Sequence, residues 1–273
     1  MVFMAHGLAL ALFTVLAVLT AAALHKSEVR VLRFSARWAM LYLWVVLILS
    51  NSTGSLLYSL VAVPLVFFAA PRTQSWIAIA LVAFLLMYPV GRVSDLIPVE
   101  NVKAWAAEEF GEDRAASLTF RFENEAKVLD RAMERPWFGW GTHCRACLFD
   151  PWSGDLESTR DGEWIIQLSD FGIIGFIGKF SFLLFPLLLL VRRIKYVPNP
   201  SDRRLLSGLA LMIGFASFDL IPNADYSRLV FVLSGALWGC LSGILQRATV
   251  MRHRRALAHI AAAKEARSVA PHR

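Results

Sequence analysis

Long apolar runs alternate with short polar segments along this chain, and one polar block is much longer than the others. The apolar runs reach or approach the ~20 residues that a helix needs to cross a hydrocarbon core of ~30 Å. Because backbone polar groups in lipid must be paired within the segment, the runs are predicted to be helices. The expected fold is therefore all-α, a polytopic helical membrane protein with about seven transmembrane helices. The predicted spans are residues 2–24, 36–50, 55–70, 76–91, 164–191, 204–221 and 229–246.

The long polar block has helical character of its own. Apolar residues recur at 3.6-residue spacing over 118–133, which predicts a helix that ends before Pro136. On that helix Arg121 and Glu125 are one turn apart and could pair. A shorter amphipathic segment, 99–110, is expected to lie along the membrane surface. Four regions follow from this pattern: transmembrane helices 1–4 in 1–91, an extracytoplasmic loop with the candidate active site in 92–163, helices 5–7 in 164–246, and a basic tail in 247–273.

Charge gives the chain an orientation. The chain carries a net charge of +7, yet residues 91–163 hold 15 acidic and 9 basic residues. Positive charge concentrates in 25–37, 192–204 and 246–273, which lie on one side of a seven-span topology. Basic connectors mark the cytoplasmic side, so the N-terminus is expected outside, the C-terminus in the cytoplasm and the large loop in the periplasm. Because the positive charge is divided among membrane-flanking segments, no nucleic-acid partner is expected, whereas the tail could contact membrane lipids.

The first run directly follows Met1, without a basic leader or a small-residue cleavage site. A cleaved signal peptide is therefore not expected.

The cysteine and acidic motifs of the loop do not predict a bound metal. His143 precedes Cys144 and Cys147, whereas covalent haem attachment needs a histidine after the second cysteine. A structural zinc site needs four ligands, and no second pair follows in the loop. In an oxidising compartment the two thiols could instead form a disulfide. Asp155 and Glu157 are spaced like a metal-holding pair, but such a pair arises easily by chance in an acid-rich loop. No cofactor is expected.

Apart from Arg37 and Arg204 at span ends, three charged residues fall inside predicted spans, where charges are costly and often functional. They are Asp170, Lys179 and Asp219. A buried contact of Lys179 with Asp219 or Asp170 would satisfy them structurally. An ion-coupled transporter that uses all three is the alternative, although paired repeats are lacking.

Arginine and tryptophan are the other candidates for chemistry in the loop. Arg121, Arg145 and Arg160 could each hold a diphosphate, because guanidinium makes bidentate bonds and stays charged. Arginines paired with the many acids are the structural alternative. Tryptophans in the loop fit either a membrane interface or stacking on sugar rings, and composition does not separate the two. They are Trp137, Trp140 and Trp152.

The order of the motifs resembles the O-antigen ligase and polymerase superfamily. A helix with an arginine is followed by a Pro-x-x-Gly-x-Gly turn, a short polar motif and an apolar helix bearing Gly-x-x-Gly. These motifs are Arg121, then Pro136, Gly139 and Gly141, then Asp161-Gly162-Glu163-Trp164, then Gly172-Ile173-Ile174-Gly175. Two further segments, 50–56 and 219–224, are similar to an exopolysaccharide polymerase-like subgroup.

The resemblance implies a bacterial inner-membrane protein that moves glycan from an undecaprenyl-diphosphate carrier to an acceptor glycan, without nucleotide sugar or metal. It implies that Arg121 and Arg145 bind the diphosphate. A base near Asp161 would activate the acceptor hydroxyl, with Glu163 and His143 as rivals for that role. The substrate site is expected to include four further residues: Arg160, Trp140, Trp164 and Asn223.

Departures from the family pattern favour a polymerase-like branch over a lipid A core ligase. Asp161-Gly162 stands where ligases usually carry His-Asn, and Thr53 where they tend to carry Arg. Family members typically have several more N-terminal spans, so the chain is expected to lack these. The alternative function is a non-catalytic accessory or transport subunit of a polysaccharide export system, with export proteins as partners.

Overall fold

The structure, a computed structural model, describes residues 7–29, 35–224 and 227–269. Within these ranges it has nine α-helices, one 3-10 turn and no β-strand, and a single isolated bridge pairs Phe149 with Leu156. The predicted all-α fold is confirmed. The helices are α1 (Gly7–Lys26), α2 (Ala36–Leu49), α3 (Thr53–Phe68), α4 (Pro71–Val93), α5 (Val99–Phe110), α6 (Glu112–Met133), α7 (Glu163–Arg193), η1 (Ile194–Tyr196), α8 (Pro200–Asp219) and α9 (Ser227–Val269).

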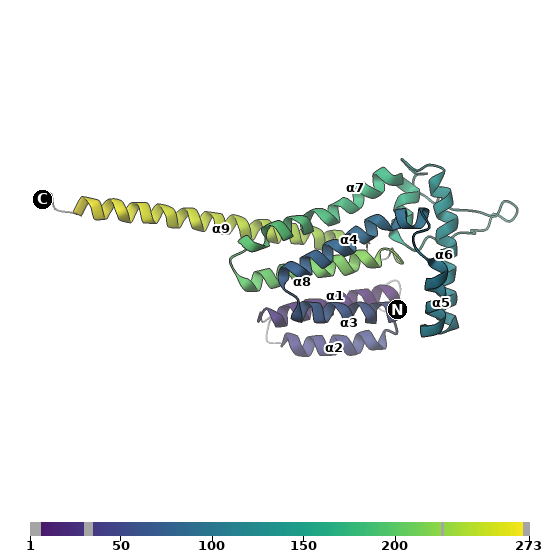
Figure 1. The fold of residues 1–273 in the computed structure, drawn as a ribbon, viewed down its shortest axis with the longest axis horizontal. Coiled ribbons are helices and arrows are strands. Elements are labelled where there is room, and N and C mark those ends of the chain that lie inside the picture. Colours follow the sequence, from purple (N-terminus) through teal and green to yellow (C-terminus); the bar gives the residue numbers. More distant parts are fainter. Residues whose placement is uncertain (1–6, 30–34, 225–226, 270–273) are drawn as a thin grey trace.

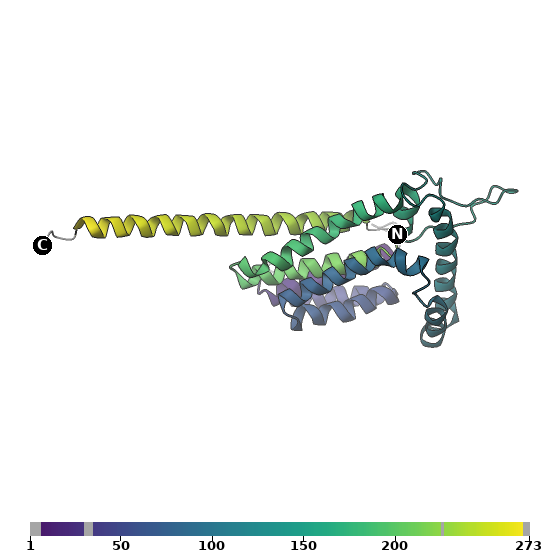
Figure 2. The ribbon, with the colours of Figure 1, turned by 45° about the horizontal axis from the view of Figure 1, so that its top comes forward.

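Helices α1–α4, α7 and α8 run side by side, and α5 and α6 lie across one end of this bundle (Figure 1). The last helix, α9, starts in the bundle and continues far beyond the opposite end (Figure 2). In the described part of the chain, four helical segments are long and apolar enough to cross a membrane, while α2 and α3 are shorter apolar helices. The four are α1, α4, the segment from α7 through η1, and residues 228–251 of α9.

Helix α8 lies in the core because small residues let its neighbours approach closely. A Cβ on Gly208 would come within 2.8 Å of the Ala23 Cβ in α1, and one on Gly214 within 2.8 Å of the Ala78 Cα in α4. Close backbone approach through small residues is how helices pack where no water drives them together. The helix therefore turns most of its surface to protein rather than to lipid.

The segment 136–141 fills a break in α7. Gly172 has φ 67° and ψ −171°, which interrupts the helix and frees backbone groups on either side. The amide of Ile173 donates to the Pro136 carbonyl at 2.7 Å, and the amides of Trp140 and Gly141 donate to the carbonyls of residues 169 and 170 at 2.9 and 2.8 Å. The Pro-x-x-Gly-x-Gly turn thus pairs with the backbone that the break at Gly172 leaves free, and the two segments form one joint between the loop and α7.

This break changes the pairing of charges in α7. Glu163 and Lys179 would be about 24 Å apart along a straight helix, yet the Lys179 ammonium contacts the Glu163 carboxylate. Asp170 pairs with Arg160 at 2.5 Å. The expected contact of Lys179 with Asp170 or Asp219 is wrong, because the break at Gly172 brings Glu163 to Lys179, while Asp170 pairs with Arg160.

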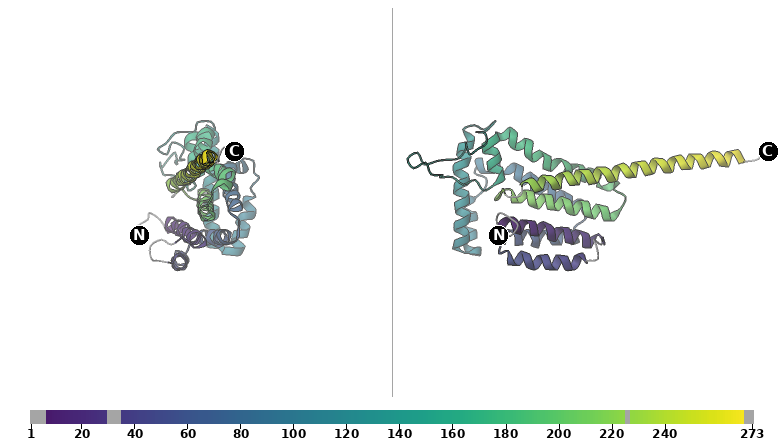
Figure 3. Two further views of the ribbon diagram at one scale, coloured as in Figure 1. Left: turned by 90° about the vertical axis from the view of Figure 1, so that its left-hand side faces the viewer. Right: turned by 180° about the vertical axis from the view of Figure 1, so that it is seen from behind.

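Each end of the bundle contains segments that the charge pattern placed on the same side of the membrane. At one end, Arg204 of α8 donates to the Lys26 carbonyl at 3.0 Å, and Ser201 donates to the Ser27 carbonyl at 2.8 Å. At the other end lie the 51–53 turn, α5, α6 and the 220–223 connector, which enclose common cavities. Viewed from behind, α9 again leaves the bundle on the side away from α5 and α6 (Figure 3).

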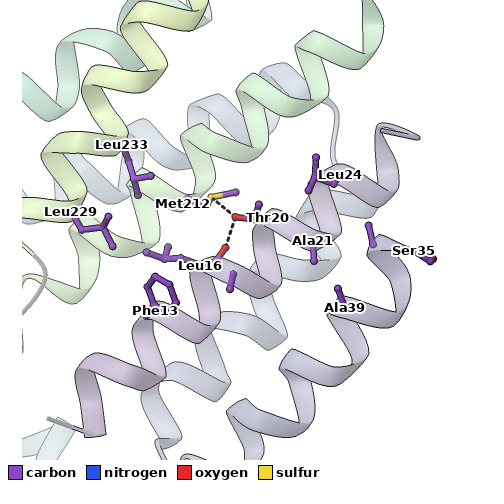
Figure 4. A pocket seen from close by; sticks show the side chains of 12 residues that line it. Phe13, Leu16, Thr20, Ala21, Leu24, Ser35, Ala39, Met212, Leu229 and Leu233 are labelled. Carbon is purple, nitrogen blue, oxygen red and sulfur yellow. Dashed lines mark hydrogen bonds between the residues drawn. The ribbon is translucent and has the colours of Figure 1, made fainter. Parts of the chain in front are cut away.

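An apolar crevice of about 560 Å³ opens between α1, α2, α8 and α9, away from the polar end of the bundle. The Thr20 hydroxyl donates to the Leu16 carbonyl and is 3.5 Å from the Met212 sulfur (Figure 4). The lining residues include no charged side chain, so the crevice suits hydrocarbon rather than phosphate.

Candidate functional site

Three segments that are far apart in the sequence meet at Arg121 of α6. The Arg121 Nη1 donates to the Pro222 carbonyl at 3.0 Å and to the Asn223 Oδ1 at 3.3 Å. Its Nε lies 3.9 Å from the Asp161 carboxylate, a separation beyond hydrogen-bonding range. The Arg121 side chain is 30% exposed, so it is held in place and still open to a ligand.

Close backbone packing holds Asp161 beside the end of α8. A Cβ on Gly162 would lie 2.1 Å from the Ile221 carbonyl oxygen, so a side chain there would force the two segments apart. The Glu163 amide donates to the Leu220 carbonyl at 2.9 Å. The Thr159 amide donates to the Asn124 Oδ1 of α6 at 2.9 Å. The short motif 161–164 is therefore fixed against both α6 and α8.

A chain of hydrogen bonds leads from Arg121 into the bundle. The Asn223 amide accepts from Arg121 and donates to the Asp219 carboxylate at 3.1 Å. The Tyr58 hydroxyl of α3 is also hydrogen-bonded to Asp219. The end of α8 thus connects the arginine to α3.

Two cavities adjoin Arg121, which lines both of them together with Leu118 and Pro222. We call the first, of about 440 Å³, the apolar cavity; six of its lining residues are Phe84, Tyr88, Phe122, Ile165, Phe218 and Ile221. Asp161 and Glu125 also line it. We call the second, of about 380 Å³, the polar cavity; six of its lining residues are Asn51, Ser52, Thr53, Ser55, Asp219 and Asn223.

Glu125 faces the apolar cavity but does not pair with Arg121. Its carboxylate accepts from the Arg92 Nε at 2.5 Å and from the Tyr88 hydroxyl at 3.1 Å. Burial raises the pKa of the Glu125 carboxyl, and Arg92 opposes that rise. The predicted Arg121–Glu125 pair is therefore wrong, since the end of α4 supplies a closer cation.

Four of the predicted site residues have structural partners instead of lining a cavity. Arg160 pairs with Asp170, and Glu163 with Lys179. Two guanidinium groups contact the Trp140 ring, that of Arg131 at 3.5 Å and that of Arg135 at 4.0 Å from its centroid. Trp164 is fully buried and packs edge-on against the Tyr88 ring, so it supports the apolar cavity from behind.

The 142–147 turn lies outside both cavities. Cys144 and Cys147 form a disulfide within it. His143 and Arg145 are exposed on this turn, and the His143 Nδ1 contacts the Thr142 hydroxyl at 2.8 Å. Among the described residues, no group of three or more His, Cys, Asp or Glu could hold a metal ion.

The structure thus brings Arg121, Asp161 and Asn223 together, and it adds residues that the sequence reasoning did not select. Sequence reasoning missed Tyr58, Tyr88, Arg92, Glu125 and Trp105 as members of the site. The sequence signal available for Arg92 was its position directly after an apolar run.

A comparison with known protein families matches residues 38–180 to the family described as O-antigen ligase. The chain belongs to the O-antigen ligase family. No curated protein and no solved structure matches it. Membership in the O-antigen ligase family implies a glycan ligase or polymerase type of function and lipid-linked glycan substrates. The matched region includes Arg121 and Asp161, whereas Asp219 and Asn223 lie beyond it.

Proposed function

We propose that this member of the O-antigen ligase family transfers glycan from an undecaprenyl-diphosphate-linked donor to an acceptor glycan at the periplasmic face of a bacterial inner membrane. The observation that carries the proposal is Arg121, a partly exposed guanidinium shared by an apolar and a polar cavity. Its present partners are two neutral oxygens and a carboxylate 3.9 Å away. A diphosphate would offer it shorter, charge-assisted hydrogen bonds.

In the proposed reaction an acceptor hydroxyl attacks the anomeric carbon of the donor sugar. The bond between that carbon and the diphosphate oxygen breaks, and its electron pair stays on the diphosphate. Arg121 stabilises this departing charge. Asp161, which loses Arg121 to the diphosphate, accepts the proton of the attacking hydroxyl. The isoprenoid next to the diphosphate occupies the apolar cavity.

The role of Asp161 is testable with a neutral replacement. We expect Asp161→Asn to lower polymer formation by about 10²–10⁴-fold, the range of positioned acid–base catalysis, while protein levels stay unchanged. The measurement is polymer analysis in a deletion strain complemented with each variant. Asp155→Asn, which changes an exposed acid in the same loop, is the matched control and should support normal polymer. Normal polymer length with Asp161→Asn would refute this role.

The proposed topology has seven membrane helices, with the 92–163 block and its disulfide in the periplasm. Disulfides persist in that oxidising compartment and are rare in the cytosol. The charge pattern supports the same orientation, because the basic segments 192–204 and 246–273 flank the other end.

This orientation predicts how many thiols can be labelled in protein taken from cells. The chain has three cysteines, and Cys240 is free. In acid-quenched, denatured protein we expect a maleimide reagent to label Cys240 alone, and all three cysteines after reduction. Labelling of Cys144 and Cys147 without reductant would contradict a periplasmic loop with a formed disulfide.

A further inference from the structure

The proposed function places the isoprenoid in the apolar cavity and leaves the polar cavity without a ligand, although Arg121 lines both. The walls of the polar cavity include the two segments 50–56 and 219–224, which lie far from each other in the sequence and meet at the end of the bundle. We propose that this cavity binds the terminal sugar ring of the acceptor glycan. This assignment rests on the proposed function and adds the location of its second substrate.

The lining of the polar cavity suits a ring with several hydroxyl groups. Its hydrogen-bonding side chains come from the 51–52 turn, from α3, α5 and α6, and from the end of α8 with the connector after it, and both donors and acceptors are present. The Asp219 carboxylate is held by the Asn223 amide and the Tyr58 hydroxyl, which fixes its orientation toward a ligand. Ten side chains in the lining can donate or accept: Asn51, Ser52, Thr53, Ser55, Tyr58, Trp105, Ser117, Arg121, Asp219 and Asn223.

An aromatic face completes the cavity. Trp105 of α5 lines it and is 53% exposed. A tryptophan provides a large apolar area at small conformational cost, which suits the apolar face of a sugar ring. Asn51 also lines the cavity, and it has φ 52° at the turn between α2 and α3. This left-handed conformation suits asparagine.

Position and lining favour the acceptor over the lipid-linked donor. The apolar cavity includes Phe84, which is 48% exposed on the membrane helix α4, so a lipid carrier can reach it from the bilayer. The polar cavity is instead lined mostly by side chains that can form hydrogen bonds, which suit a sugar better than an isoprenoid. Because a nucleophile approaches the anomeric carbon opposite the leaving group, the acceptor belongs across Arg121 from the carrier. Its attacking hydroxyl would reach past Arg121 to Asp161, whose carboxylate lies 3.9 Å from the Arg121 Nε. A volume of about 380 Å³ lies at the small end of the ~300–1,000 Å³ typical of ligand sites.

The test separates the acceptor from the donor kinetically, using the full chain in proteoliposomes. The donor is the lipid-linked oligosaccharide extracted from cells that lack the gene, and the acceptor is the same oligosaccharide released by mild acid. We expect Trp105→Ala to raise the KM for the free oligosaccharide about tenfold, which corresponds to about 1.4 kcal/mol, with the KM for the donor unchanged. Trp105→Phe should retain most of the affinity.

A second variant and a matched control keep the test independent of folding defects. Asn51→Gly permits the same backbone conformation and removes the amide, so the acceptor KM should rise severalfold. Trp76→Ala removes a tryptophan near the start of α4 that is about as exposed as Trp105, and it should change neither KM. A rise in the donor KM alone, or no change in either KM, would overturn the assignment. Absence of product from the wild type would instead refute the proposed function.

Discussion

Replacing Arg121 with lysine should lower kcat/KM for the lipid-linked donor by about 10²–10³-fold, the usual effect of removing one donor that stabilises a departing charge. Lysine keeps the positive charge but loses the planar fork that binds two diphosphate oxygens at once. Loss of the contacts to Pro222 and Asn223 also frees the end of α8. The measurement is initial-rate kinetics in proteoliposomes at several donor concentrations.

The control for this variant is Arg72→Lys, an exposed arginine near the start of α4 at the far end of the bundle. It makes the same chemical change away from both cavities and should leave kcat/KM within twofold. If Arg121→Lys kept wild-type kinetics, the guanidinium would not hold the diphosphate. That result would refute the proposal that this site binds the lipid-linked donor.

Gly172→Ala should prevent the protein from accumulating in a folded form. A Cβ at this position would lie 2.4 Å from the carbonyl carbon and oxygen of Trp137, and Gly172 has φ 67°. Both the clash and the left-handed backbone penalise alanine, so we expect a loss of more than about 3 kcal/mol of stability. The measurement is the amount of monodisperse protein after detergent extraction, followed by thermal unfolding.

Gly178→Ala is the matched control in the same helix. Nothing lies within 4 Å of a Cβ at Gly178, so alanine there should be tolerated or slightly stabilising. Gly139→Ala, whose Cβ would lie 2.6 Å from the Asp170 backbone, should fail like Gly172→Ala. Normal yield and melting temperature for Gly172→Ala would show that the joint between 136–141 and α7 is not a close contact.

The apolar pattern predicted the helices well because each run had to become a helix to satisfy its backbone in lipid. It failed at α7, where the break at Gly172 lies within an apolar stretch and is stabilised by residues 136–141. No local pattern reveals a partner 30 residues upstream. The ion pair of Lys179 was mispredicted for the same reason, because its contact with Glu163 depends on the direction of the chain after the break. Asp170 pairs with Arg160, which lies before α7.

The candidate site was predictable only in part. Arg121 and Asp161 were selected by motif order, and the structure places them side by side at 3.9 Å. Glu125 was assigned the wrong partner because Arg92 comes from α4, and helical spacing within α6 carries no information about that helix. The polar cavity was not predictable, since its walls come from the 51–55 turn, α5 and the end of α8, which meet only in the folded chain.

The accessory-subunit alternative and the enzyme differ in what the isolated protein does. The most direct measurement is to supply the purified chain, alone in proteoliposomes, with the lipid-linked oligosaccharide and an acceptor glycan. The proposed function predicts a longer glycan together with released undecaprenyl diphosphate, with both products lost in Arg121→Lys. The central claim would be contradicted if the purified wild type formed neither product while its gene still restored polymer in the deletion strain.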